Sequence, residues 1–420
     1  MKLTKESHKL MSFFIKHNCL LPIKQTRKTD AIFKKLYDDI VDGVSYIEEL
    51  KSKTGPSFYK VKLDIITNIS QIPKPRTFPP NSFPSQVRNH IDEYSLGLIT
   101  YSFHLFERDI NIMFLIEDGN PEDLIETYNK YVDYMLVWLY IVNEYSSRSC
   151  VDKLKIYVYH TSLLKILPST NIEILGWNNI NTAFTRTCPK DSEIVVFRKE
   201  EWFKAFMHET FHNFGLDFSD MNQTSVNAKI LSIFPVNSEV NLYESYTEFW
   251  ARIMNSLFCS YINMKNKEDI DEFLTNAEFF INFERIFAFF QMIKVLNFMN
   301  MTYKDMYNSS IQSENIRKTM FKENTNVLSY YIITLILLNG YQDTIAWCNL
   351  NNTSLLQFKK TTSNLDEFCK FIEKKYKTKA MLDGVNCTER LLVRTEKASK
   401  KQRSMIYLIK NLRMTICELG

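Results

Sequence analysis

Glycine, proline and long apolar runs are scarce in this chain. Its 420 residues include 9 Gly and 11 Pro, too few for the many tight turns of an all-β protein. The longest apolar run, Tyr330 to Leu338, has nine residues, whereas a helix that spans a bilayer needs about 20. The first 18 residues are charged and amphipathic and lack the apolar stretch of a signal peptide. We therefore expect a soluble, mainly helical, intracellular protein.

A strong net charge and closely spaced cysteines are also missing. Lys and Arg number 52 against 48 Asp and Glu, so the net charge of +4 is too small to indicate nucleic-acid binding. The basic cluster from Lys397 to Arg403 is typical of a solvated helix surface. The eight cysteines form no CxxC pair and several lie in apolar runs, which indicates reduced core thiols in a reducing compartment. Abundant Asn, Lys and Ile fit an AT-rich genome, such as that of a protist or a large DNA virus.

Hydrophobic periodicity divides the chain into three parts. Residues 1–95 predict helices followed by a connector, because five prolines between residues 72 and 84 exclude a helix or a central strand there. Residues 96–265 predict a small mixed sheet and one central helix. Residues 266–420 predict helices almost throughout. The expected fold class is therefore α+β, mainly helical, with helical lobes on both sides of a central core that restrict access to it.

Within these parts, each element is predicted from its local pattern. Apolar or alternating runs predict strands, and apolar residues at a spacing of 3.6 predict helices. The predicted strands are 109–116, 152–159, 181–185 and 193–197. The predicted helices of the central part are 121–145 and about 199–215, and the second ends at Gly215 in a left-handed cap. The helices predicted further on are 241–264, 268–299, 324–348, 364–376 and 386–418.

The sequence His208-Glu209-Thr210-Phe211-His212 gives the strongest chemical signal in the chain. Two histidines four residues apart lie one turn apart on the same face of a helix, so both imidazoles can bind one ion. Glu209 then lies beside the open side of that ion and can accept a proton from a water. Such a motif arises by chance in roughly 0.01 of chains of this composition. The alternative interpretation is a helix with two surface histidines.

A third ligand is expected, because a catalytic zinc usually has three protein ligands. Glu244 and Glu248 follow the motif by about thirty residues and lie four residues apart, on one face of a helix. Either carboxylate can be the third ligand, and the other can then accept a hydrogen bond from a histidine N–H. In isolation, this pair would indicate only surface carboxylates on an amphipathic helix.

The HExxH motif followed by Glu244-x-x-Thr247-Glu248-aromatic-x-Ala251 resembles the zincin metallopeptidases, and within them the gluzincin branch. The resemblance covers roughly residues 105–265 and implies a zincin-like core of a small mixed sheet and the HExxH helix. It also implies one Zn²⁺ ion and the following roles: His208, His212 and Glu244 as ligands, Glu248 as support and Glu209 as general base. Lethal-factor-like domains show a pattern that instead favours Glu248 as the ligand. The metzincin pattern is disfavoured, because Phe218 stands where its third ligand belongs.

The resemblance implies a zinc metallopeptidase, a hydrolase that cleaves the peptide bonds of a peptide or protein substrate. The segment Asn181-Thr182-Ala183-Phe184-Thr185 matches the zincin edge strand, which pairs with an extended substrate. An oxyanion donor is also needed, and it is left open among Tyr243, Tyr246 and His160. The alternative is a zincin-fold structural or binding protein whose metal site is vestigial or non-catalytic.

Overall fold

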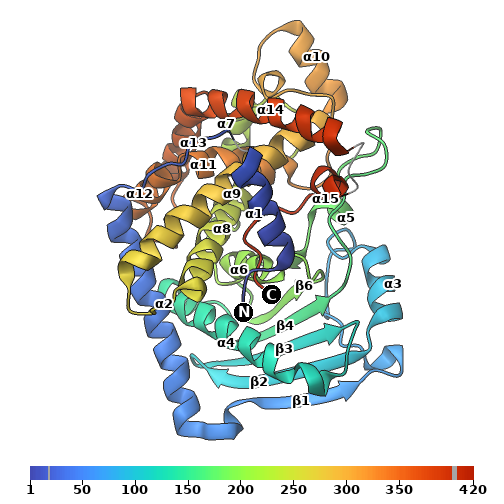
Figure 1. The fold of residues 1–420 in the computed structure, drawn as a ribbon, viewed down its shortest axis with the longest axis vertical. Helices are drawn as coiled ribbons and strands as arrows, with labels where there is room; N and C mark the ends of the chain where they lie inside the picture. Colours follow the sequence, from blue (N-terminus) through green and yellow to red (C-terminus); the bar gives the residue numbers. More distant parts are fainter. Residues whose placement is uncertain (18, 400–403) are drawn as a thin grey trace.

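The computed structural model describes residues 1–17, 19–399 and 404–420 and has the expected α+β, mainly helical fold (Figure 1). The strands are β1 (Lys60–Ile65), β2 (Gly97–Leu105), β3 (Arg108–Ile116), β4 (Lys153–His160), β5 (Ala183–Thr185) and β6 (Asp191–Val196). The helices up to the HExxH motif are α1 (Lys5–His17), α2 (Arg27–Thr54), α3 (Ser85–Tyr94), α4 (Pro121–Tyr145), α5 (Trp177–Ile180) and α6 (Trp202–Asn213).

Helices make up almost all the regular structure after α6. They are α7 (Thr224–Ile233), α8 (Leu242–Asn263), α9 (Ile270–Phe298), α10 (Ile311–Met320), α11 (Thr334–Asn339), α12 (Tyr341–Asn351), α13 (Thr362–Lys375), α14 (Lys379–Ser399) and α15 (Ser404–Lys410), with a π-helical segment at Leu328–Ile333. Residues 400–403 of the basic cluster lie outside the described residues. In the ranges that the structure describes, no helix combines the length and the apolar character needed to cross a bilayer.

The strands form one mixed sheet in the order β1-β2-β3-β4-β6-β5. β3, β4 and β6 are parallel, whereas β1, β2 and β5 are antiparallel to their neighbours. β3, β4, β5 and β6 confirm the four predicted strands, and α4 confirms the helix between the first two. β1 and β2 are absent from the sequence prediction. β1 is a largely exposed edge strand, so its burial pattern lacks the alternation that identifies a strand.

The two faces of the sheet are covered by different parts of the chain. Alternate residues of β4 point to opposite faces. Ile156 and Val158 belong to the main core, which also contains the apolar residues of α4 and α6. Tyr157 and Tyr159 belong to a second cluster with α3 and the proline-rich segment, which forms neither a helix nor a strand, as predicted. The proline-rich segment thus lies on the face opposite α6.

Helix α6 is buried between the sheet and the helices α4 and α8 (Figure 1). Every residue of α6 is buried. Its polar side chains must therefore find partners inside the protein, because an unpaired buried polar group costs free energy. Thr210 illustrates this, since its hydroxyl accepts a hydrogen bond from the indole N–H of Trp138 in α4 at 2.7 Å.

The helix predicted at 386–418 is wrong after Lys410, where α15 ends. The last ten residues instead form a buried, non-helical segment beside the start of α6. The backbone N–H groups of Met414 and Thr415 donate to the Glu201 carboxylate at 2.6 and 2.5 Å. Glu201 has a left-handed φ of 61° and forms an ion pair with Lys165 at 2.6 Å. Carboxylate acceptors thus replace the backbone partners that a helix would provide.

The cysteines also differ from the sequence prediction. Cys150 forms a disulfide with Cys188, and Cys19 forms one with Cys387, with Cα atoms 4.8 and 6.1 Å apart. The cysteines that remain free are buried: Cys259, Cys348, Cys369 and Cys417. The expectation of reduced core thiols is therefore wrong for four of the eight. Sequence spacing does not reveal pairing between distant cysteines, because pairing depends on the folded geometry.

Candidate metal centre

Helix α6 presents the two histidines of the HExxH motif on one side. It spans Trp202–Asn213, within the predicted range, and Gly215 follows it with a φ of 65°, as expected for a left-handed cap. His208 Nε2 and His212 Nε2 lie 3.1 Å apart. Two ring nitrogens at this distance can share one cation, which is the arrangement that the spacing predicts.

Helix α8 brings Glu244 to the same point. Glu244 Oε2 lies 3.0 Å from His208 Nε2 and 3.3 Å from His212 Nε2. The three residues form a group whose ligand atoms all lie within 4.8 Å of one another and could hold a metal ion. Burial alone would raise the pKa of Glu244, but the adjacent His212 and His208 lower it overall. The cluster therefore offers two imidazoles and an ionised carboxylate.

The outer nitrogens of both imidazoles are held by carboxylates. His208 Nδ1 lies 3.0 Å from Glu248 Oε2, and His212 Nδ1 is hydrogen-bonded to Asp217 Oδ2. A carboxylate at Nδ1 takes the N–H there, fixes the ring orientation and leaves Nε2 free to bind a metal. The structure thus places Glu244 at the inner nitrogens and Glu248 at an outer one. Asp217 was missed in this role, although its position five residues after His212 marks it as a neighbour.

Glu248 is itself held by two buried cations. Lys204 Nζ lies 3.0 Å from both carboxylate oxygens, and Arg252 Nε donates to Oε1 at 2.8 Å. Burial alone would raise the pKa of Glu248, but Lys204 and Arg252 hold it well below its ordinary value. Glu248 therefore stays ionised, and it links Lys204 and Arg252 to His208.

A small pocket lies beside the cluster and contains Glu209. Its volume is about 20 Å³, enough for about one water. Glu209 and His208 line it together with Thr182 and Tyr330. Burial raises the pKa of Glu209 to about 7. The Thr182 hydroxyl is buried, and the described residues provide it with no hydrogen-bond partner. The pocket thus places a proton acceptor and an unpaired polar group where a water fits.

The predicted edge strand lies at this pocket. Asn181, Thr182 and Ala183 line it, and β5 is the outer strand of the sheet. Phe184 packs on the opposite face, among the aromatic residues of the second cluster, and Thr185 donates its hydroxyl to Glu193 O at 2.7 Å. The segment 322–325 lies against the chain just before β5: Asn324 N–H donates to Leu175 O at 3.0 Å, and the Thr325 hydroxyl donates to Asn181 Oδ1 at 2.7 Å. That segment therefore lies beside the chain that leads into β5.

The three predicted oxyanion donors lie outside this pocket. Tyr246 donates its hydroxyl to Leu356 O at 2.8 Å, and His160 is buried with Nδ1 3.0 Å from the hydroxyl of Tyr128. The ring of Tyr243 packs edge-on against His212, with the ring centres 5.8 Å apart. Of the three, Tyr243 lies nearest to the cluster, and the choice among them stays a prediction.

Tyr330, which the sequence analysis did not single out, lines the pocket beside His208 and Glu209. Its hydroxyl donates to Glu244 Oε2 at 3.0 Å, and its ring packs edge-on against His208. Tyr330 lies in the π-helical segment Leu328–Ile333, and such segments are frequent at functional sites. The sequence showed it only as the start of an apolar run, because 86 residues separate it from Glu244.

No protein-family model, curated protein or solved structure matches the chain. What this site does must therefore be inferred from its geometry and chemistry.

Proposed function

We propose that this protein is a zinc-dependent metallopeptidase of the gluzincin type. The observation that carries this proposal is the convergence of His208 Nε2, His212 Nε2 and the Glu244 carboxylate beside the pocket of Glu209. The spacing of the donor atoms supports zinc, because ligands bound tetrahedrally at about 2.0–2.2 Å lie about 3.3–3.6 Å apart, close to the spacing seen here. Both outer histidine nitrogens already have carboxylate partners, as zinc-binding histidines generally do.

In this proposal, the protein's own groups divide the work of peptide hydrolysis. Zinc, when bound, supplies a Lewis acid that lowers the pKa of a water and polarises the scissile carbonyl. Glu209 accepts the proton of the attacking water and later delivers it to the leaving amine. A proton acceptor whose pKa lies near 7 suits both steps, because it can gain and lose the proton at neutral pH.

Tyr330 is the donor that we assign to the developing oxyanion. It lies in the pocket of Glu209, and burial raises its pKa well above its ordinary value, so that it keeps its proton. The substrate backbone would pair with β5, and Thr182 would hydrogen-bond to it. Because the pocket holds only about one water, a peptide gains access only when residues that line the pocket move apart.

A metal-binding protein without hydrolytic activity is the second candidate, and the closed pocket is the observation that favours it. The buried position of Glu209 argues against this second candidate. A buried carboxyl group costs free energy and contributes nothing to a structural metal site, which normally has four protein ligands.

Replacement of Glu209 by Gln tests the proposal. The variant keeps the side-chain size and all three ligands but removes the proton acceptor, so we expect unchanged zinc content and at least ~10²-fold slower cleavage of a peptide library. The matched variant His208→Ala should lose both zinc and cleavage. The wild-type protein could bind zinc and yet give no cleavage product that is missing with Glu209→Gln. That result would overturn the peptidase proposal in favour of the metal-binding protein without hydrolytic activity.

A further inference from the structure

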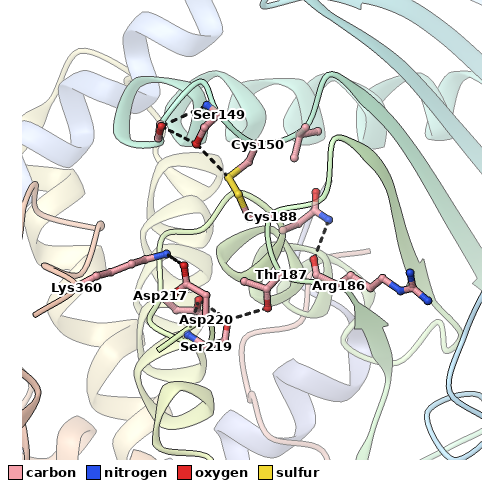
Figure 2. Close-up of a disulfide and its surroundings, with 12 residues drawn as sticks. Ser149, Cys150, Arg186, Thr187, Cys188, Asp217, Ser219, Asp220 and Lys360 are labelled. Carbon is pink, nitrogen blue, oxygen red and sulfur yellow. Dashed lines mark hydrogen bonds and ion pairs between the residues drawn. A yellow bond between two sulfur atoms is a disulfide. The ribbon is translucent and has the colours of Figure 1, made fainter. Parts of the chain in front are cut away.

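The disulfide between Cys150 and Cys188 lies against the end of the helix that carries His212 (Figure 2). Cys150 follows α4, and Cys188 lies in the turn between β5 and β6. A Cβ atom added to Gly215, the left-handed cap of α6, would lie 3.3 Å from Cys150 Sγ. The disulfide therefore packs directly on the cap of α6.

The turn that contains Cys188 holds His212 at two points. The Cys188 N–H donates to the backbone carbonyl of His212 at 3.2 Å. The second connection runs through side chains. The hydroxyls of Thr187 and Ser219 are 2.8 Å apart, and Ser219 donates to Asp217 Oδ1 at 2.8 Å (Figure 2). Asp217 Oδ2 is in turn hydrogen-bonded to His212 Nδ1. The position of this turn thus affects both the backbone and the imidazole of a candidate metal ligand.

The disulfide is also within reach of a reductant. Cys150 is buried, but Cys188 is half-buried, and its neighbours in the turn, Arg186 and Lys190, are exposed. A thiolate can therefore approach the sulfur of Cys188. The other disulfide, Cys19–Cys387, joins the chain after α1 to α14, and both of these helices pack on α9. It provides a matched control within the same protein.

We propose that Cys150–Cys188 is a reversible redox site that sets how tightly the histidine–glutamate cluster binds Zn²⁺. This inference rests on the proposed function, because it requires the cluster to bind zinc. With the disulfide formed, the turn is fixed, and Asp217 orients His212. With the disulfide opened, the turn moves, and the orientation of His212 is less restricted.

The reductant is a dithiol. Its thiolate attacks Cys188 Sγ, the S–S bond breaks, and Cys150 leaves as a thiolate that takes up a proton. The second thiol of the reductant then attacks the mixed disulfide and releases Cys188 as a thiol. The protein gains two electrons and two protons, and the dithiol becomes a disulfide.

The change is confined to the turn. The backbone bonds Val151 N–H to Pro189 O and Asp152 N–H to Lys190 O, at 2.9 and 2.8 Å, hold the two segments together without the disulfide. The sheet therefore stays intact on reduction. Loss of the partners that orient a metal ligand lowers metal affinity about 10–100-fold. Because Asp217 remains in place, we expect an effect near the lower limit, about tenfold.

Zinc affinity, measured by competition with a chromophoric chelator, tests the inference on the full-length protein. The double variant Cys150→Ser/Cys188→Ser should bind zinc about tenfold more weakly than the oxidised wild type. Reduction with dithiothreitol, which itself binds zinc and is removed under anaerobic conditions before the titration, should not weaken it further. The double variant Cys19→Ser/Cys387→Ser should keep the wild-type affinity and bind zinc about tenfold more weakly after the same reduction. Equal affinities in the two double variants would overturn the inference while leaving the zinc site intact.

Hydrogen exchange of the metal-free protein gives a second readout that needs neither zinc nor activity. The amides of Phe214 and Gly215, which close the end of α6, should exchange faster in Cys150→Ser/Cys188→Ser than in Cys19→Ser/Cys387→Ser. Equal exchange rates would overturn the idea that this disulfide holds the end of the helix. A wild-type protein that binds no zinc in either redox state would overturn the proposed function, and the exchange rates would still decide whether the disulfide holds α6.

Discussion

Replacement of Glu248 by Gln separates the residue that supports the candidate metal site from the residue that binds the ion. The Glu248 carboxylate is buried and accepts hydrogen bonds from Lys204, Arg252 and His208. Gln has one acceptor oxygen, and its NH₂ group must face one of these donors. The variant therefore removes the negative charge that Lys204 and Arg252 share, and it leaves at least one of the three donors facing an NH₂ group.

The expected loss of stability is large. Removal of one partner from a buried ion pair costs about 3–5 kcal/mol, because the remaining charge stays buried. The Gln oxygen keeps one hydrogen bond, so we expect a loss of about 3 kcal/mol, a sizeable part of the total stability of a typical protein. Zinc affinity should also fall, by about 10–100-fold, because His208 loses its orienting partner.

Urea unfolding of the metal-free protein and zinc competition measure the two effects. Glu314→Gln is the control for stability, since Glu314 is exposed and solvent screens its ion pair with Lys318, so that its loss should leave the stability almost unchanged. Glu244→Gln is the control for ligation and should abolish tight zinc binding. An unfolding free energy within about 1 kcal/mol of wild type would refute the account of Glu248. If zinc binding survived in Glu244→Gln but not in Glu248→Gln, Glu248 would be the ligand and Glu244 the supporting residue.

Two further predictions concern Tyr330 and His160. Tyr330→Phe should keep its zinc but lower kcat about 10²-fold, as loss of an oxyanion donor does, and an unchanged kcat would exclude this role. Burial lowers the pKa of His160 to about 3 from its ordinary 6.5, so the unfolded chain binds a proton below pH 6.5 that the folded protein does not. His160 should therefore make stability fall by about 1.4 kcal/mol per pH unit below 6.5, and urea unfolding at pH 7, 6 and 5 should show a shallower fall for His160→Gln. An unfolding free energy that falls equally steeply with pH in the wild type and in His160→Gln would contradict this prediction.

Elements with a strong local pattern were predictable from the sequence. β3, β4 and β6 are short apolar or alternating runs, and α4 has both an N-terminal proline and a regular apolar face. The helix with His208 and His212 was predictable for the same reason, because the spacing of its residues determines which side chains share a face. Local periodicity thus identified the central strands, their connecting helix and the two histidine positions.

Features that depend on distant parts of the chain were not predictable. Tyr330 reaches Glu244 only because the C-terminal helices pack on α8, and no spacing rule connects them. The extended segment at the end of the chain depends on the buried carboxylates of Glu201 and Glu284. The Cys150–Cys188 disulfide forms because β4 and β6 are neighbours in the sheet. In each case the deciding partner lies far away in the sequence.

The two ends of α6 and the segment 322–325 beside β5 are held with very different strength. Glu201 fixes the start of α6 through an ion pair and buried backbone bonds, and the disulfide turn fixes its end. Residues 322–325 are held against residues 175–181 by a few hydrogen bonds, each of which contributes about 0.5–1.5 kcal/mol. A state a few kcal/mol above the ground state is populated at about 0.1–10%. Residues 322–325 can therefore separate from residues 175–181 without unfolding of the protein. Tyr330, which is buried in the π-helical segment, would stay with the cluster when these residues separate.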